Sequence, residues 1–215
     1  MDRLTKPRLQ DGVRALCHRD SHLAAVVSRF GPPPLWARRP GYATLVQIVL
    51  EQQVSLASAR ATFTRLEQAC GAVTAERFAG LSETTIRAAG VTRQKASYCV
   101  GIARDIVDGT LCLTAVARAN DETARQKLVR IRGIGPWTAD IYLLMALKRP
   151  DVWPDGDLAL AIAAQQVKGL QGRPDTVRLR HLAGKWSPWR AVAARILWHH
   201  YLSTRGRSTG VDFGT

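Results

Sequence analysis

The stretch IRGIGPWTADIY, residues 131–142, contains residue types that suit contact with a charged ligand. Gly133 and Gly135 permit positive φ angles and have no Cβ that would hold a ligand off. Pro136 suits the first turn of a helix, where its missing N–H is not needed. The free N–H groups and the dipole of such a helix start favour a phosphate. A plain turn between helices needs only one such glycine, so the pair favours a sequence-independent grip on a DNA backbone, with Ile134 pointing into the core.

The overall charge supports a polyanionic partner. Lys and Arg total 31 against 17 Asp and Glu, which gives a formal net charge of +14. Such an excess is typical of nucleic-acid binding, although a solvated basic surface would give the same count. No apolar run approaches the roughly 20 residues that a transmembrane helix needs. Because the first residues also lack the apolar core of a secretion signal, we expect a cytoplasmic, nucleoid-associated protein of bacterial type without membrane contact.

The elements that must position the glycine pair are predicted to be helices. From Tyr42 to Gly71, apolar residues recur at spacings of three and four, which predicts one long helix or two consecutive ones ending at a Gly71 cap. Asn120 is a plausible N-cap for the helix that precedes the glycine pair. Alternating strand patterns are absent, and LCLTAV (111–116) is too short to support a sheet. An all-α fold is therefore expected. Further helical patterns cover residues 82–90, 92–109, 121–133, 138–148, 157–167, 175–186 and 187–204.

Three segments of the sequence resemble those of a known protein family. IRGIGPWTA is similar to the hairpin of the helix-hairpin-helix (HhH-GPD) DNA glycosylases, DVWPDGDLAL (151–160) to their catalytic segment, and LVQIVLEQQVSLASA (45–59) to their wedge helix and loop. The alkylation-repair branch, 3-methyladenine DNA glycosylase II, fits best. The resemblance implies two helical lobes with the active-site cleft between them and no N-terminal β domain. It implies an N-terminal segment 1–41 packing with a C-terminal lobe 149–206, a central lobe 42–148 with its hairpin near 128–146, and a flexible tail 207–215.

The resemblance implies that Asp157 is the catalytic carboxylate. Cleavage of an N-glycosidic bond builds positive charge on the sugar, which a fixed carboxylate stabilises while it orients or deprotonates water. An N-cap is the other common role for an Asp at a helix start, and Asp155 is the rival carboxylate. Bifunctional relatives carry a Schiff-base lysine two residues after the second hairpin glycine. Trp137 stands there, so a monofunctional enzyme without abasic-site lyase activity is expected.

The remaining site residues follow from the same resemblance. Trp137 and Trp198 match aromatic walls of the pocket for a flipped, cationic alkylated base, and Tyr142 and His199 are weaker candidates. Gln53 occupies the wedge position, where leucine is usual. The residues expected at the DNA backbone are Arg132, Gly133, Ile134, Gly135, Thr138, Arg93 and Lys95.

The expected function is excision of alkylated purines such as 3-methyladenine and 7-methylguanine from double-stranded DNA, which leaves an abasic site in base excision repair. Two alternatives stay open: a glycosylase for neutral lesions such as hypoxanthine, ethenoadenine or uracil, and a non-catalytic DNA-binding module. We expect a monomer that needs no cofactor, with a monovalent cation as a candidate at the hairpin. The cysteines 17, 70, 99 and 112 are widely separated, which predicts buried free thiols and no metal or iron–sulfur cluster.

Overall fold

The computed structural model describes residues 3–205, and the expected tail 207–215 lies outside the described residues. In this range all regular elements are helices, so the predicted all-α fold is confirmed. The chain divides into two compact units. The terminal unit consists of residues 3–37 with 147–205, and the central unit consists of residues 38–146.

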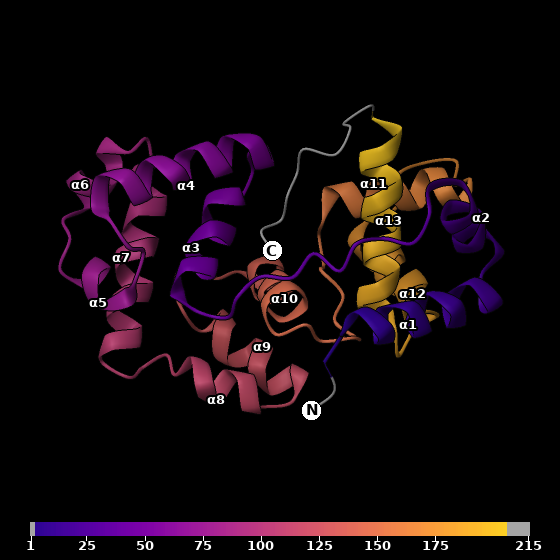
Figure 1. Cartoon of the computed structure of the whole chain (residues 1–215), viewed down its shortest axis with the longest axis horizontal. Helices are drawn as coiled ribbons and strands as arrows, with labels where there is room; N and C mark the ends of the chain where they lie inside the picture. The colour runs from indigo at the N-terminus through magenta and orange to yellow at the C-terminus, as the bar shows by residue number, and fades with distance from the viewer. Residues whose placement is uncertain (1–2, 206–215) are drawn as a thin grey trace. The chain divides into compact units, whose positions relative to one another are not determined.

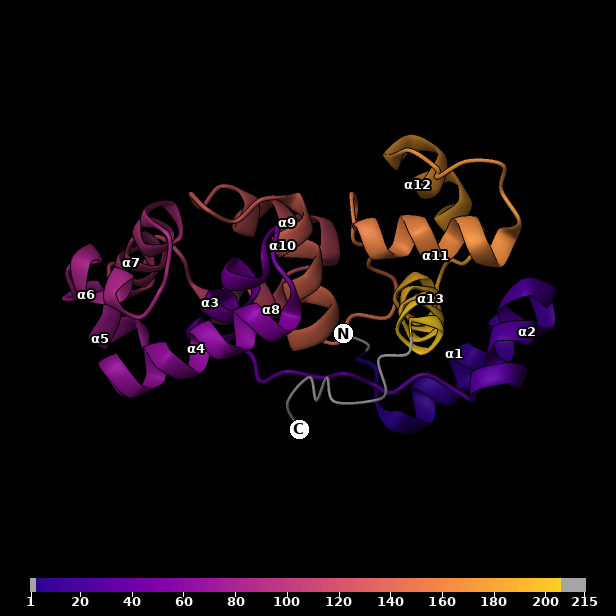
Figure 2. The ribbon, with the colours of Figure 1, turned by 90° about the horizontal axis from the view of Figure 1, so that it is seen from above.

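The terminal unit is built around its last helix, α13 (Arg190–Thr204). Eight consecutive residues of α13, Ala191–Trp198, are buried, as expected of a helix that is covered on all sides. The covering helices, which surround the yellow α13 in Figures 1 and 2, are α1 (Lys6–Arg19), α2 (Ser21–Phe30), α11 (Leu158–Lys168) and α12 (Thr176–Gly184). Both ends of the chain therefore contribute to one core.

The central unit contains the other helices. Its apolar helix α3 packs against α4, α7 and α10 and buries Leu45, Ile48 and Val49 completely. The helices labelled in Figure 1 are α3 (Tyr42–Glu51), α4 (Leu56–Cys70), α5 (Ala75–Ala79), α6 (Glu83–Ala88), α7 (Arg93–Val107), α8 (Leu113–Arg118), α9 (Asp121–Val129) and α10 (Pro136–Ile141). The π-helix η1 (Tyr142–Ala146) follows α10 directly.

Local sequence signals explain several helix ends. The stretch from Tyr42 to Gly71 forms two helices, and Gly71 ends the second with a φ of +71°. The Asn120 side chain accepts a hydrogen bond from the N–H of Thr123 at 2.8 Å, which confirms the predicted N-cap of α9. The LCLTAV segment contributes to α8 rather than to a strand. None of the helices among residues 3–205 is both long and apolar enough to span a bilayer.

Candidate functional site

The hairpin between α9 and α10 closes on a buried isoleucine. The N–H of Ile134 donates to the carbonyl of Ile131 at 3.0 Å, and the Ile134 side chain is 2% exposed, as the sequence predicted. Because the N–H closes the turn and the side chain is buried, neither group can contact DNA. The prediction of Ile134 as a backbone contact is therefore wrong for these two groups.

Glycine occupies the two hairpin positions for different physical reasons. Gly133 has a φ of +94°, and a Cβ on it would stand 2.4 Å from Cγ of Tyr98, so the fold itself requires glycine there. Gly135 has an ordinary φ of −77° and is the N-cap residue of α10, and a Cβ on it would meet no protein atom within 4 Å. The expectation of positive φ is correct for Gly133 only. For Gly135, space for an approaching ligand stays the predicted reason.

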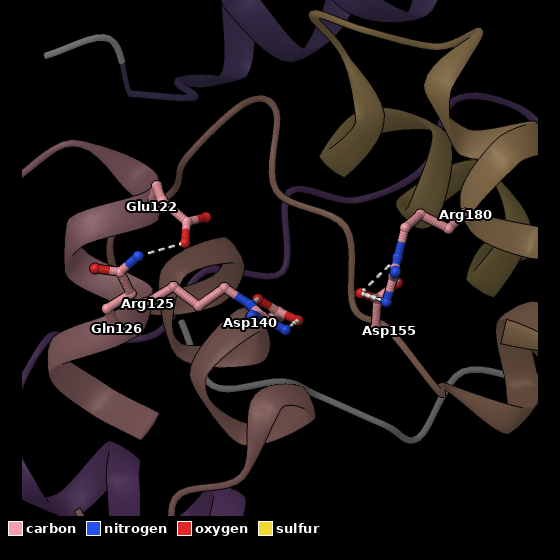
Figure 3. A network of polar contacts seen from close by, with 6 residues as sticks. All are labelled: Glu122, Arg125, Gln126, Asp140, Asp155 and Arg180. Atoms are coloured by element: carbon pink, nitrogen blue, oxygen red, sulfur yellow. Dashed lines mark hydrogen bonds and ion pairs between the residues drawn. The ribbon is translucent and has the colours of Figure 1, made fainter. Parts of the chain in front are cut away.

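An ion pair joins the two helices of the hairpin. Nε of Arg125 on α9 donates to Oδ1 of Asp140 on α10 at 2.7 Å, as Figure 3 shows. Asp140 is 2% exposed, and a buried carboxylate needs such a partner to offset its lost hydration. The pair therefore holds α10 on α9 and fixes the orientation of the turn.

A groove of about 560 Å³ runs along the hairpin within the central unit. It is lined by the turn 129–135 and by Gln52, Gln53, Gln94, Lys95 and Tyr98. Arg132 and Arg93, two of the predicted DNA contacts, are exposed. The groove thus brings the predicted wedge loop and the predicted phosphate grip onto one surface.

Two predicted DNA contacts near the groove are already hydrogen-bonded within the protein. The Thr138 side chain is 1% exposed and its hydroxyl accepts a hydrogen bond from Nε2 of Gln52 at 2.9 Å, which excludes a contact between that hydroxyl and DNA. Nζ of Lys95 donates to the carbonyls of Leu50 and Gln52, each at 2.8 Å. Sequence reasoning missed these roles because the partners lie more than 40 residues away in the chain.

In the terminal unit, Asp157 is held by two hydrogen bonds. Its Oδ1 accepts from the N–H of Leu160 at 2.8 Å, which makes Asp157 the N-cap of α11, and from Nε1 of Trp198 at 3.2 Å. The residue is 9% exposed. The cap and the predicted catalytic role therefore do not compete, because capping fixes the carboxylate in one orientation beside an indole.

The neighbouring aspartates of the same loop have other partners. Asp155 accepts hydrogen bonds from Arg180 on α12, the shortest of them 2.7 Å, and this ion pair is drawn in Figure 3. Asp151 accepts from the side chain of Arg190, with Nε at 2.9 Å, and from its main-chain N–H. Both carboxylates are thus paired with arginines, which favours Asp157 over Asp155 as the predicted catalytic carboxylate.

The predicted aromatic residues lie in different surroundings. Tyr142 is fully buried in the central unit, where its hydroxyl accepts from the N–H of Gly41 at 3.1 Å and burial raises its pKa to about 12. Its predicted role in the base pocket stays a prediction. Trp198 is 8% exposed and contacts Asp157, while Nε2 of His199 lies 3.0 Å from the carbonyl of Phe30. Trp137, in the central unit, is half-buried, and its pocket role stays a prediction.

The described residues contain no cluster of three or more His, Cys, Asp or Glu side chains able to hold a metal ion. All four cysteines are free thiols. Cys70 and Cys99 are buried as predicted, Cys17 is half-buried, and Cys112 is exposed, which contradicts the expectation for that residue. The monovalent cation at the hairpin stays a prediction.

A family model, the HhH-GPD superfamily of base excision DNA repair proteins, matches residues 46–188. The chain therefore belongs to this superfamily. A putative DNA-3-methyladenine glycosylase of Bacillus subtilis is 28% identical, over 82% of this chain and 64% of that protein. A second B. subtilis protein, a DNA-3-methyladenine glycosylase, is 31% identical over 57% of this chain and 41% of that protein. The chain thus spans less than two thirds of either relative.

Solved structures share the fold. The 3-methyladenine DNA glycosylase of Schizosaccharomyces pombe, in complex with abasic DNA, superposes with a TM-score of 0.82 and 23% identity over 95% of this chain and 99% of that one. A DNA-3-methyladenine glycosidase of Bacillus halodurans gives 0.73 and 29% over 90% of each chain. An 8-oxoguanine glycosylase/lyase of Clostridium acetobutylicum gives 0.77 with 15% identity over 90% of this chain and 69% of that one. The fold is therefore common to proteins named glycosylases and to a protein named a glycosylase/lyase.

Proposed function

We propose that this protein is a DNA glycosylase that excises alkylated purines from double-stranded DNA and leaves an abasic site. The observation that carries the proposal is the buried carboxylate of Asp157, fixed by the N–H of Leu160 and by Trp198 in a family of base excision repair proteins. A fixed carboxylate stabilises the positive charge that develops on the sugar as the glycosidic bond breaks, without reorganising during the reaction. The same carboxylate orients or deprotonates the attacking water.

The central unit supplies a surface for DNA. The groove beside the hairpin is lined by Gly133 and Gly135, which have only main-chain atoms, and by Arg132, which is exposed. Main-chain N–H groups and exposed arginines position a protein on DNA without reading its sequence. Such binding suits an enzyme that must find a rare lesion in any sequence context. A pure DNA-binding module, the non-catalytic alternative, would need Asp157 only as the N-cap of α11.

The proposal is tested by base release from methylated duplex DNA, with Asp157→Asn and Asp155→Asn as a matched pair. Asparagine caps helices about as well as aspartate, so Asp157→Asn keeps α11 while it removes the charge. We expect its rate constant to fall by about 10² to 10³, in the range found when one group that stabilises transition-state charge is removed. Asp155→Asn removes only the ion pair with Arg180 and should stay within about threefold of the wild type. Wild-type protein that binds DNA but releases no base would refute the proposal.

The identity of the released bases determines the lesion class. Cationic 3-methyladenine and 7-methylguanine are attracted to indole rings by about 0.5–2 kcal/mol, and Trp198 lies directly against Asp157. We therefore propose that these bases are released faster than neutral ones. Duplexes that contain hypoxanthine, ethenoadenine or uracil are the comparison. Faster release of a neutral base would reassign the lesion class and leave the enzyme assignment intact.

We further propose that the protein hydrolyses the glycosidic bond without cleaving the strand. The indole of Trp137 cannot form the Schiff base that a lysine at this position would form. Incubation with abasic duplex and borohydride should give no covalent protein–DNA product and no strand scission beyond the spontaneous rate. A trapped adduct would show that another amine of the chain acts as nucleophile.

A further inference from the structure

The loop that carries the predicted wedge residue has an unfavourable backbone conformation. Gln53, between α3 and α4, has a φ of +59° and an exposed side chain, and the neighbouring Val54 is 46% exposed. A residue other than glycine in this region costs of order 1 kcal/mol and persists only where its surroundings hold it. Contacts from α7 and from the hairpin hold this loop.

The first contact is the ammonium group of Lys95, near the start of α7. Its Nζ donates to the carbonyl of Leu50, in the last turn of α3, and to the carbonyl of Gln52, in the loop itself, each at 2.8 Å. Carbonyls at a helix C-terminus lack intrahelical partners and attract a positive charge. The Lys95 side chain is half-buried, and desolvation lowers its pKa. The Lys95 ammonium group therefore binds these carbonyls in place of water.

The second contact joins the loop to the hairpin. Nε2 of Gln52 donates to the carbonyl of Gly133 at 3.1 Å and to the hydroxyl of Thr138 at 2.9 Å. Lys95, Gln52 and the hairpin thus form a continuous hydrogen-bonded connection along the groove that Gln53 also lines. A shift of the loop would break contacts to α7 and to the hairpin together.

We propose that Lys95 and Gln52 are positioning residues that hold the Gln53 loop on the hairpin, so that the wedge is in place before DNA is opened. This inference rests on the proposed function, because a wedge matters only if a base is flipped. Unstacking a base costs a few kcal/mol, and a preformed wedge offsets part of that cost without first being ordered. In this role Lys95 acts on the protein's own carbonyls and not on a DNA phosphate.

The test compares Lys95→Met and Gln52→Leu with Lys6→Met, a substitution of an exposed lysine in α1. Single-turnover base release at saturating enzyme should fall by about tenfold to a hundredfold in the first two variants and stay unchanged in the third. The fluorescence of 2-aminopurine placed beside the lesion, which reports unstacking, should fall in parallel. Thermal unfolding identifies any variant that no longer folds, and Gln52→Leu tests the loop without altering α7.

The salt dependence of binding to undamaged duplex distinguishes positioning from phosphate contact. Loss of a lysine that contacts phosphate lowers the slope of log K against log salt by about 0.9. We expect no change in slope for Lys95→Met and a change of about this size for Arg93→Met, in which an exposed arginine is removed. A lower slope for Lys95→Met with an unchanged release rate would overturn the inference and make Lys95 a phosphate ligand.

A measurement without activity separates this inference from the proposed function. In the DNA-free protein, Lys95→Met should speed amide hydrogen exchange at residues 52–54, while Lys6→Met should not. Unchanged exchange together with normal base release would overturn the positioning role alone. If the wild type releases no base from any duplex, the proposed function fails, and the wedge interpretation fails with it even where the exchange result holds.

Discussion

At the residue scale, the two hairpin glycines allow folding and binding to be separated. Gly133→Ala places a Cβ 2.4 Å from Tyr98 and forces a φ of +94° on alanine. Overpacking alone costs about 1–3 kcal/mol, so the variant should unfold at clearly lower denaturant concentration. Gly135→Ala meets no protein atom within 4 Å and should lose no more than about 1 kcal/mol, the cost of alanine at an N-cap.

Substitution of Gly135 should also affect the binding of DNA. If a phosphate approaches the main chain at Gly135, the added methyl group should weaken binding of undamaged duplex by about tenfold, measured by fluorescence anisotropy. The effect should be seen at temperatures where both Gly135→Ala and the wild type are fully folded. Full affinity in Gly135→Ala would mean that the phosphate lies elsewhere along the groove.

At the element scale, Asp20 joins three parts of the terminal unit. Its side chain caps α2 through the N–H of His22 and accepts hydrogen bonds from Nζ of Lys168 at 2.6 Å and from Nε1 of Trp186 at 2.8 Å. Burial alone would raise the pKa of Asp20, but the hydrogen bonds from Lys168 and Trp186 outweigh it and lower the pKa. The ionised carboxylate is therefore the form that stabilises the fold.

This depressed pKa gives the pH dependence a definite sign. A carboxylate whose pKa is lower in the folded protein adds stability above its unfolded pKa of about 3.9 and loses it as pH falls through the folded value. Asp20→Asn should cost about 1–3 kcal/mol at pH 7 and should flatten the acid side of the stability curve below about pH 4. Asp11→Asn, which removes an exposed pair with Arg14 within α1, should cost less than about 1 kcal/mol. Equal effects of the two substitutions would contradict the role of Asp20.

Elements were predictable from sequence where the cause is local. Asn120 caps the start of α9 and Gly71 caps the end of α4. Both caps depend on contacts within a few residues, and both were predicted correctly. The buried Ile134 followed from its place between two glycines. The hydrogen bonds of Tyr142 and Thr138 could not be predicted, because their partners Gly41 and Gln52 are 101 and 86 residues away in the chain.

Some basic side chains bind the protein's own carbonyl groups. Nε of Arg65 and of Arg104, like Nζ of Lys95, donates to carbonyls at or near the ends of other helices, at Ala89 and Ala79 respectively. A basic residue that caps a helix contributes to the net charge of +14 without being placed for DNA. Composition could not distinguish these uses, because the partner of each residue is set by the tertiary fold.

At the scale of the whole molecule, the central unit is one uninterrupted segment whose ends meet. The N–H of Arg38 donates to the carbonyl of Met145 at 3.0 Å, and the Arg38 guanidinium forms two hydrogen bonds with Glu51. A compact segment with its own core and adjacent ends commonly folds alone. We therefore expect residues 38–146, produced as a separate chain, to show helical circular dichroism and a cooperative thermal transition.

The isolated central unit should also separate DNA binding from base release. It retains the hairpin groove, so it should bind undamaged duplex, but it lacks Asp157 and should release no base from methylated DNA. A chain of residues 40–146 is the control, because it lacks Arg38 and leaves Glu51, a mostly buried carboxylate, without its ion-pair partner. Removal of one partner of such a pair typically costs about 3–5 kcal/mol, so the shorter chain should unfold at lower temperature. Equal stability of the two chains would show that the closing contacts do not hold the unit together, and base release by residues 38–146 would place the chemistry outside Asp157.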